Sequence, residues 1–377
     1  MKKKLEILDI EILECLDRYG PRNISHIAHE TGVTWDTVNY RLDRLSTFFS
    51  LNCVIGVKSS SVGLRNAFLV IKSVPSSIEL LLNCLKMNDF WRYIGQSYGG
   101  LNNVIGIYSI PIEYSKSFSE FFTFLKSLDF VNEIKLYWIT GFYTVNPSLN
   151  WFDSDLGRWV LRWDDWVEEI PQIEGKPHPA LVTPKDFPLQ ADDVDIKILS
   201  RLEINGKENL REIAQRLNLT SPDISYHFKE HILKKGLIGQ WNIILKRFQD
   251  NCDYYFFIFK FFHEEDMMKF ARSLLDKPFS LSVARVFNEK TLIAHLIIPS
   301  IEFSKFLHSL DVLMRCSLLQ YYDYIMEDFS KSLGHTIAYN CFKSKEWIYD
   351  HQKHLKKLIE LISESQRTTE PQFNKIQ

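Results

Sequence analysis

The chain has 377 residues, of which 45% are hydrophobic and 14% aromatic, and its net charge at pH 7 is −2. This length predicts two or more domains, and the apolar content excludes a largely disordered chain. The near-neutral charge excludes a basic surface over the whole molecule, and the six cysteines lack the CxxC spacing of a zinc site.

The first residues, MKKKLEILDIEIL, place acidic side chains where a signal peptide requires an apolar run. The best apolar stretch, YYFFIFKFF, is too short for a membrane span and contains Lys260. We therefore expect a cytoplasmic protein without a membrane-spanning segment.

Three short helical patterns follow one another within residues 1–58. Apolar residues recur at helical spacing as far as Gly20, a typical glycine at a helix C-terminus. Asn23 can cap a short second helix, and Thr34 can cap a third. The inward face of the third helix consists of Val38, Leu42 and Leu45. A short helix, a tight turn and a capped helix predict a helix-turn-helix, and we expect a wing strand after it.

Residues 62–147 show the order βαββαβ, which is the ferredoxin-like plan. The expected elements are a strand at 66–74, a helix at 76–87, strands at 92–98 and 103–110, a helix at 113–128 and a strand at 131–145.

Residues 148–190 combine a tryptophan-rich and a proline-rich segment. Trp159, Trp163 and Trp166 recur at helical spacing, which favours a helix that packs on a domain over a ligand cage. The five prolines of 170–190 predict an extended linker.

The second half of the chain repeats the first. Residues 8–51 align without a gap to residues 194–237, and the words IEYSK (112–116) and IEFSK (301–305) open the same predicted helix in both copies. We expect a winged helix-turn-helix at 191–246, in which Thr220 and Asp223 cap the third helix. A ferredoxin-like domain follows at 250–328, with strands at 252–262, 281–287, 291–298 and 317–326 and helices at 264–275 and 300–313. A C-terminal helix and tail occupy 329–377.

This order of domains resembles the Lrp/AsnC family of feast/famine transcription regulators, with the family's unit present twice in one chain. The resemblance is carried by the segments IAHETGVTWDTVNYRLDRL, VGLRNAFLVIKS and IAQRLNLTSPDISYHF. The resemblance implies an α+β fold in which two winged helix-turn-helix domains alternate with two ferredoxin-like domains. It implies a sequence-specific DNA-binding regulator, not an enzyme, that needs no cofactor and binds double-stranded DNA and a small-molecule effector. Because one chain contains both units, we predict an intrachain pseudo-dimer on an asymmetric DNA site, and pairing of two chains stays open.

A recognition helix presents polar side chains to the major groove, where Asn and Arg read base edges. The DNA-binding candidates are Trp35, Asp36, Thr37, Asn39, Tyr40, Arg41 and Arg44 in copy one, and Ser221, Asp223, Ser225, Tyr226, His227 and Lys229 in copy two. Neither unit is strongly basic, so a helix-turn-helix that only packs is the alternative.

The family carries its effector pocket near the turn between the second and third strands of the βαββαβ domain. Copy one has SYGGLNN there, which predicts Tyr98, Gly99, Gly100 and Asn102 as effector-binding residues. Copy two has VFNEKT (286–291), which we expect only to pack, and neither segment contains the Gly-Asp turn usual in the family.

Two histidine pairs, His26/His29 and His227/His231, lie at helical spacing. No third ligand is identifiable for either pair, so we predict no metal site.

No motif of a hydrolase or nucleotide-binding enzyme occurs in the sequence. Siroheme decarboxylases, however, look like Lrp/AsnC proteins and can occur as fused pairs. They hold an acidic tetrapyrrole with Arg and His side chains around the first strand of the βαββαβ domain. In that stretch this sequence offers Lys58 and Arg65. An enzyme of tetrapyrrole metabolism is therefore the alternative to the regulator.

Overall fold

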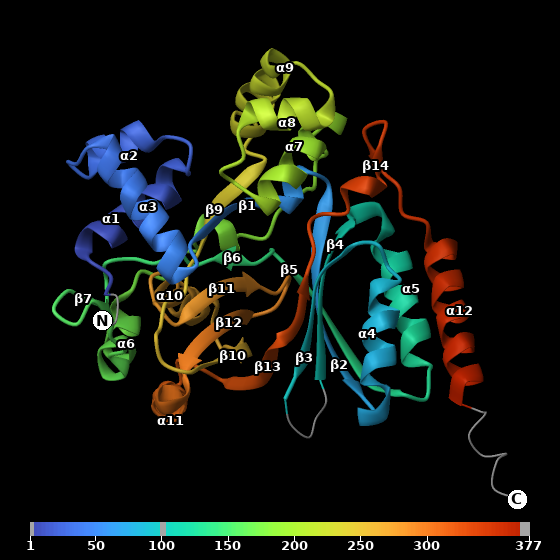
Figure 1. The fold of residues 1–377 in the computed structure, drawn as a ribbon. Helices are drawn as coiled ribbons and strands as arrows, with labels where there is room; N and C mark the ends of the chain where they lie inside the picture. The colour runs from blue at the N-terminus through green and yellow to red at the C-terminus, as the bar shows by residue number, and fades with distance from the viewer. Residues whose placement is uncertain (1–3, 99–102, 370–377) are drawn as a thin grey trace, which may run out of the picture.

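The computed structural model describes residues 4–98 and 103–369 (Figure 1). Its fold is α+β, with two winged helix-turn-helix units that alternate with two ferredoxin-like units, as the sequence predicts. The limits of the individual domains stay predictions.

The first copy begins with the helix-turn-helix and continues into the βαββαβ unit. Its elements are α1 (Ile7–Tyr19), α2 (Ile24–Glu30), α3 (Trp35–Phe49), β1 (Asn52–Val57), β2 (Leu64–Ser73), α4 (Ile78–Lys86), β3 (Trp91–Ser97), β4 (Asn103–Pro111), α5 (Ser115–Lys126), β5 (Val131–Ile139) and β6 (Tyr143–Thr144). A short hairpin and a helix follow, β7 (Phe152–Asp153), β8 (Arg158–Trp159) and α6 (Trp163–Glu169).

The second copy has the same order. Its elements are α7 (Asp193–Ile204), α8 (Leu210–Leu217), α9 (Ser221–Tyr226), the π-helix η6 (His227–Leu233), β9 (Ile238–Ile244), β10 (Cys252–Lys260), α10 (Glu264–Leu274), β11 (Ser280–Arg285), β12 (Thr291–Pro299), α11 (Phe303–Arg315) and β13 (Tyr321–Gly334). It too ends in a hairpin and a helix, β14 (Phe342–Lys343), β15 (Glu346–Trp347) and α12 (His351–Thr369). The hairpin and helix after each ferredoxin-like unit were expected to lie outside the repeat, but they correspond to each other. The repeat is therefore longer than the sequence suggested.

Most of the predicted helix caps are present. Thr34 accepts a hydrogen bond from the backbone of Thr37, and Thr220 accepts one from that of Asp223. The expected cap by Asn23 is wrong: its side chain makes no capping hydrogen bond, and its ψ of 51° lies outside the extended region that an N-cap needs. Ser50 has a φ of 55°, the left-handed conformation that Gly236 adopts at the equivalent position.

The two ferredoxin-like units share one nine-stranded sheet in the order β5-β2-β4-β3-β13-β10-β12-β11-β6. Strand β13 extends beyond the predicted 317–326 because its end pairs with β3, with Leu333 opposite Ile94. The predicted strand 131–145 is broken, because Gly141 turns the chain with a φ of 99° and sends β6 to the edge of β11.

The two wing strands pair with each other instead of with strands of their own units. β1 runs antiparallel to β9, with Cys53 opposite Ile243. The glycines that end the first helices contact the opposite wing: Gly20 lies against Trp241, and the Gly206 N–H donates to the Cys53 carbonyl at 2.9 Å.

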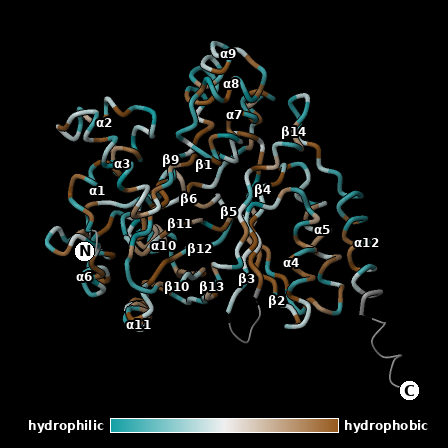
Figure 2. Tube along the Cα trace, viewed as in Figure 1, coloured by the Kyte–Doolittle hydropathy of each residue, from teal (hydrophilic) through white to brown (hydrophobic). Residues whose placement is uncertain are grey.

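The hydrophobic cores show that the copies are interleaved. One continuous core joins α1–α3 and α6 to the second ferredoxin-like unit, and another joins α7–α9 and α12 to the first unit. Figure 1 shows each helix-turn-helix above strands of the other copy, and Figure 2 shows hydrophobic residues along β2, β3 and β4. A third core, which includes Phe68 and Phe256, lies between the two units.

Within residues 4–98 and 103–369, none of the helices combines the length and the hydropathy needed to cross a bilayer.

Candidate functional site

A cavity of about 870 Å³ lies between the two copies. Its wall combines both wing strands, the connection 139–144, the linker at 178–184 and sheet residues from each ferredoxin-like unit. Because the wings cross-pair and the linker closes one side, neither half of the chain forms this cavity alone. The volume lies within the range of pockets that enclose small molecules or cofactors.

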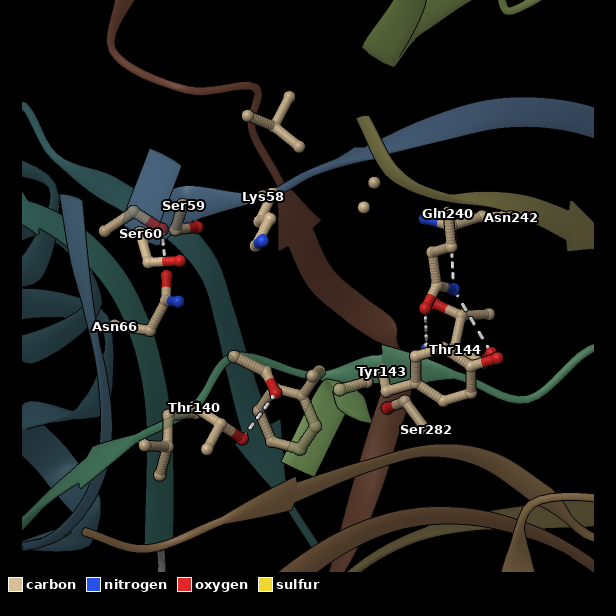
Figure 3. Close-up of a pocket in the computed structure, with 18 of the residues that line it drawn as sticks. Lys58, Ser59, Ser60, Asn66, Thr140, Tyr143, Thr144, Gln240, Asn242 and Ser282 are labelled. Atoms are coloured by element: carbon tan, nitrogen blue, oxygen red, sulfur yellow. Dashed lines mark hydrogen bonds between the residues drawn. The ribbon is translucent and has the colours of Figure 1, made fainter. Parts of the chain in front are cut away.

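Amide and hydroxyl groups line much of the cavity (Figure 3). Gln240 donates to the Thr144 carbonyl at 3.1 Å and to Asn242 Oδ1 at 2.5 Å, and its own Oε1 accepts from the Thr144 backbone at 3.2 Å. On the other side, Ser109 donates to Asn66 Oδ1 at 2.6 Å. These bonds hold the second wing against β6 and fix amide groups in the wall.

The cavity contains charges of both signs. Lys58 is exposed and extends between the Ser59–Asn66 side and the Gln240–Thr144 side (Figure 3). Arg92 is instead committed to Glu203, with its Nη2 2.6 Å from Glu203 Oε1. Burial raises the pKa of Asp17, which accepts a hydrogen bond from Asn146 at 2.6 Å. Lys58 is therefore the side chain best placed to meet an anionic group.

A histidine held by a buried carboxylate forms part of the wall. His295 of β12 places Nε2 3.0 Å from Glu327 Oε2, and the ring stacks on Phe256 at 4.2 Å between ring centroids. Ser332 donates to Glu327 at 2.6 Å, and the Tyr93 hydroxyl donates to the same carboxylate. A histidine oriented by a carboxylate is the arrangement of a general acid or base.

The electrostatics of this cluster favour an ionised Glu327. Burial alone would raise the pKa of Glu327, but the hydrogen bonds from His295, Ser332 and Tyr93, with the charge of His295, lower it below its usual value. Burial and the neighbouring Glu327 raise the pKa of Tyr93, which therefore keeps its proton.

The linker contributes a second histidine, His178. Its Nδ1 accepts from the Ala180 backbone at 3.3 Å, and its ring lies 4.8 Å from that of Tyr143. Burial, followed by the charge of Arg272, lowers the pKa of His178. The imidazole is consequently neutral near pH 7, with Nε2 as its donor.

Arg65, the second cation noted in the sequence, lies outside the cavity lining. Its guanidinium is stacked 4.2 Å from the centroid of Trp138 and 5.1 Å from that of Phe287, and burial lowers its pKa. Lys58 alone of the two cations faces the cavity.

The two arginines predicted to read DNA are engaged inside the protein. Arg44 Nη1 lies 2.6 Å from Asp9 Oδ2, and Arg41 Nη1 lies 3.3 Å from Asp9 Oδ1 and 2.9 Å from a Glu6 oxygen. Because Asp9 is fully buried, these ion pairs fix α3 against α1. Base contacts by these residues stay a prediction, in competition with this structural role.

The other DNA-binding candidates are divided between exposed and engaged side chains. Trp35, Asp36, Tyr40, Ser221, Tyr226 and Lys229 are exposed. The remaining candidates are partly covered or hydrogen-bonded: Thr37 to Thr34, Asn39 to the Trp35 carbonyl, Asp223 to Thr220 and His227 to Asp195, with Ser225 half-buried.

The predicted effector residues lie mostly outside the described part of the chain, because residues 99–102 include Gly99, Gly100 and Asn102. Tyr98 is exposed, and its N–H donates to the Met326 carbonyl at 2.9 Å. It is not part of the cavity lining, and the effector assignment stays a prediction.

The second-copy histidine pair lies beside two carboxylates. The ligand atoms of His227, His231, Asp192 and Asp195 are all within 4.8 Å of one another. The sequence suggested no third ligand, because both aspartates lie more than thirty residues upstream at the start of α7.

Sequence reasoning missed the His295–Glu327 pair, although one signal was present. His295 interrupts the apolar strand TLIAHLIIP, and a histidine in such a strand needs a buried polar partner. The partner could not be identified in advance, since Glu327 belongs to a strand that was expected to end at residue 326.

The fold is a duplicated arrangement of winged helix-turn-helix and ferredoxin-like units, with a ligand-sized space between the two copies. The siroheme decarboxylase NirDL is similar in structure, with a TM-score of 0.52 at 12% identity over 95% of this chain and 99% of that chain. NirDL in complex with an iron-uroporphyrin III analogue gives a TM-score of 0.51 at 12% identity, over 94% of this chain and 98% of that chain. AsnC of E. coli gives a TM-score of 0.29 at 14% identity, over 36% of this chain and 92% of that chain.

No protein-family profile and no curated protein sequence matches the chain. The full-length similarity to NirDL is a similarity of fold. The sequence favoured a protein without enzymatic activity, and this similarity gives that expectation no support.

Proposed function

We propose that the chain is an enzyme of the siroheme-decarboxylase type, which binds a carboxylated tetrapyrrole in the cavity between its two copies. The observation that carries this proposal is the His295–Glu327 pair in the wall of a space of about 870 Å³. The full-length similarity of fold to NirDL adds support from the whole molecule.

Decarboxylation replaces a carbon–carbon bond to CO₂ by a carbon–hydrogen bond, so the reacting carbon must gain one proton. The hydrogen bond of His295 to an ionised Glu327 stabilises the protonated imidazole and fixes the ring. Stacking on Phe256 fixes the ring plane further. We assign His295 as the proton donor, and the protonated Tyr93 hydroxyl as the group that helps to keep Glu327 in place.

Lys58 and the amides of the wall suit the substrate carboxylates. An ammonium group and amide N–H donors bind carboxylates through charge-assisted hydrogen bonds. Asn66 and Gln240 lie on opposite sides of the Lys58 side chain (Figure 3). We assign Lys58 as the residue that binds the substrate carboxylate placed between these two sides.

The balance of charge limits how a tetrapyrrole can be oriented in the cavity. Arg92 is neutralised by Glu203, and Asp17 adds a second acidic group to the wall. A ligand with carboxylates around its whole edge would place some of them beside these acids. We infer that the protein binds the substrate carboxylates that lie on the side of Lys58.

An absorbance titration with siroheme tests the binding step. Wild-type protein is expected to shift and sharpen the Soret band with saturation, whereas Lys58→Glu should weaken binding by about tenfold or more, because it replaces an attraction by a repulsion worth roughly 1–3 kcal/mol. Lys116→Glu is the matched control, because Lys116 is exposed on α5, away from the cavity. An unchanged siroheme spectrum with the wild-type protein contradicts the proposal.

A DNA-binding regulator is the second candidate, favoured by aromatic side chains exposed on the recognition helices. Trp35 is 54% exposed, Tyr40 67% and Tyr226 57%. Selection from a random DNA pool tests this function. Enrichment of a sequence that Tyr40→Ala no longer selects would favour the regulator, whereas salt-sensitive binding without enrichment would reflect only nonspecific attraction.

A further inference from the structure

The start of α7 and the π-helix η6 bring four metal-binding side chains together. His227 Nδ1 lies 2.8 Å from Asp195 Oδ1, and His231 Nδ1 lies 3.1 Å from Asp195 Oδ2. Each imidazole also has a second carboxylate nearby, because both Nδ1 atoms are 3.6 Å from oxygens of Asp192. Asp195 is fully buried, so its charge requires compensation within the protein.

The first copy provides an internal comparison for this cluster. Glu6 and Asp9 occupy the equivalent positions in α1, and they face the guanidinium groups of Arg41 and Arg44. At the positions of these arginines the second copy has His227 and Glu230, and His231 replaces Leu45. Two carboxylates that meet two fixed positive charges in copy one therefore meet two imidazoles in copy two.

The replacement changes the chemistry of the site. A guanidinium group is always charged and has no lone pair to offer, whereas a neutral imidazole nitrogen is a metal ligand. If both imidazoles are neutral, the negative charges of the two carboxylates are not compensated by them. A divalent cation would balance these charges. Two nitrogen and two oxygen donors match the tetrahedral coordination that zinc adopts in proteins.

The carboxylates retain capacity for a metal although they also cap α7. Asp192 Oδ1 accepts from the Val194 and Asp195 backbone at 2.9 and 3.0 Å, and Asp195 Oδ2 accepts from the Asp192 backbone at 3.1 Å. A carboxylate has about four lone-pair positions, so each aspartate can still offer one to a cation.

The backbone differs between the copies at the same place. The segment 227–233 is a π-helix, whereas α3 is a regular α-helix throughout its 15 residues. Single turns of π-helix occur frequently at functional sites. The change in helix type coincides with the change from arginines to histidines.

We propose that His227, His231, Asp192 and Asp195 form a site for a divalent transition-metal ion of the zinc type, which joins α7 to η6 in the second helix-turn-helix. The ion takes the place of the two arginines that join α1 to α3 in the first. The site is separate from the cavity residues His295 and Glu327, and it does not depend on the proposed enzymatic function.

Equilibrium dialysis of the chelator-treated full chain against Zn²⁺, with elemental analysis, tests the site. We expect one equivalent of zinc for the wild type and none for H227R/E230R/H231L, which installs the side chains of copy one and should remain folded. H26Q/H29Q is the matched control and should retain one equivalent, since Glu30 is the one carboxylate paired with these histidines in the part of the chain that the structure describes.

Two further measurements keep the outcome decisive. His231→Gln should lower zinc affinity by at least about tenfold without changing the circular dichroism spectrum, because one ligand is lost. Co²⁺ should give the visible absorption of a four-coordinate site in the wild type and in H26Q/H29Q, but not in H227R/E230R/H231L. The proposal would be overturned if the wild type bound no more zinc than H227R/E230R/H231L, or if H26Q/H29Q lost zinc binding. An unaltered zinc affinity in His231→Gln would also overturn it.

Discussion

At the scale of single residues, buried carboxylates organise this protein. Asp9, Asp195 and Glu327 are all nearly or completely buried, and each meets a different kind of partner: two arginines, two histidines, or a histidine with two hydroxyl groups. A buried carboxylate is stable only when it is paired, so each one fixes the side chains around it. Glu327 is the one that faces the cavity through His295.

Replacing His295 tests its assignment as proton donor. His295→Gln preserves a polar side chain but cannot deliver a proton, and turnover of siroheme should fall by about 10²–10⁴-fold. Siroheme binding should change little, because Lys58 and the wall amides remain. His263→Gln, at an exposed position before α10, serves as the control. Steady-state kinetics that show equal turnover for His295→Gln and wild type would remove His295 from the mechanism.

The lowered pKa of Glu327 predicts how stability depends on pH. Because the pKa is lower in the folded than in the unfolded state, Glu327 stabilises the protein above its unfolded pKa of about 4.3. That contribution is lost as the pH falls through the folded pKa. Urea unfolding between pH 3 and 6 should show this decline in the wild type and a weaker one in Glu327→Gln. Parallel curves for the two proteins would contradict the ionised state of Glu327.

At the scale of elements, the hairpin and helix that end each copy act as covers for the opposite copy. α6 packs on α11 of the second unit and, through Trp166, on Phe270 of α10, whereas α12 packs on α4 and α5 of the first. Trp166 is fully buried among Phe270, Phe279 and Phe306, and its Nε1 donates to Ser273 at 3.1 Å. All three tryptophans are buried, as predicted, but only Trp163 and Trp166 lie on the helix, because Trp159 belongs to β8. Their packing partner comes from a distant part of the chain.

Truncating Trp166 measures how strongly α6 holds the second unit. Trp166→Ala should lower the free energy of unfolding by about 3–5 kcal/mol, because it empties a well-packed site. Trp35→Ala removes an exposed tryptophan and should change stability by less than about 0.5 kcal/mol. Chemical denaturation of both variants makes the comparison, and equal effects would show that α6 is not essential to the core.

At the scale of the whole molecule, the two copies are interleaved into one structure. Each helix-turn-helix shares a core with the ferredoxin-like unit of the other copy, and the wings pair across the middle. The cavity is a product of this arrangement, because its wall needs β1 and β9 as well as residues from both ferredoxin-like units. Pairing of two chains, which the sequence left open, is not required to complete it.

A glycine at the crossing point tests the interleaving. A Cβ added to Gly206 would lie 2.7 Å from the Cys53 carbonyl oxygen, so the first wing would have to move. Gly206→Ala should therefore cost about 1–3 kcal/mol and weaken siroheme binding. Gly334→Ala is the matched control, because the space around Gly334 is open. If both substitutions had the same effect on thermal unfolding, the close contact at Gly206 would be unimportant.

The sequence predicted the local order of the fold but not its long-range arrangement. Helical spacing, caps and the aligned repeats identify the two helix-turn-helix units and the βαββαβ order, since these depend on neighbouring residues. The pairing of β1 with β9 depends on how the copies cross. The meeting of His295 with Glu327 depends on the strand order β13-β10-β12 within the second unit. Asp195 lies 32 residues before His227, and no local periodicity relates them. The candidate site could therefore be recognised only from its assembled geometry.

The central claim is that the cavity removes CO₂ from a tetrapyrrole, and product analysis after anaerobic incubation with siroheme tests it most directly. Mass spectrometry of the recovered pigment should show loss of CO₂ at an enzyme-dependent rate, with the reaction abolished or strongly slowed by His295→Gln and by Lys58→Glu. Recovery of siroheme with its mass unchanged, under conditions where the wild-type protein is folded and saturated with pigment, would contradict the account.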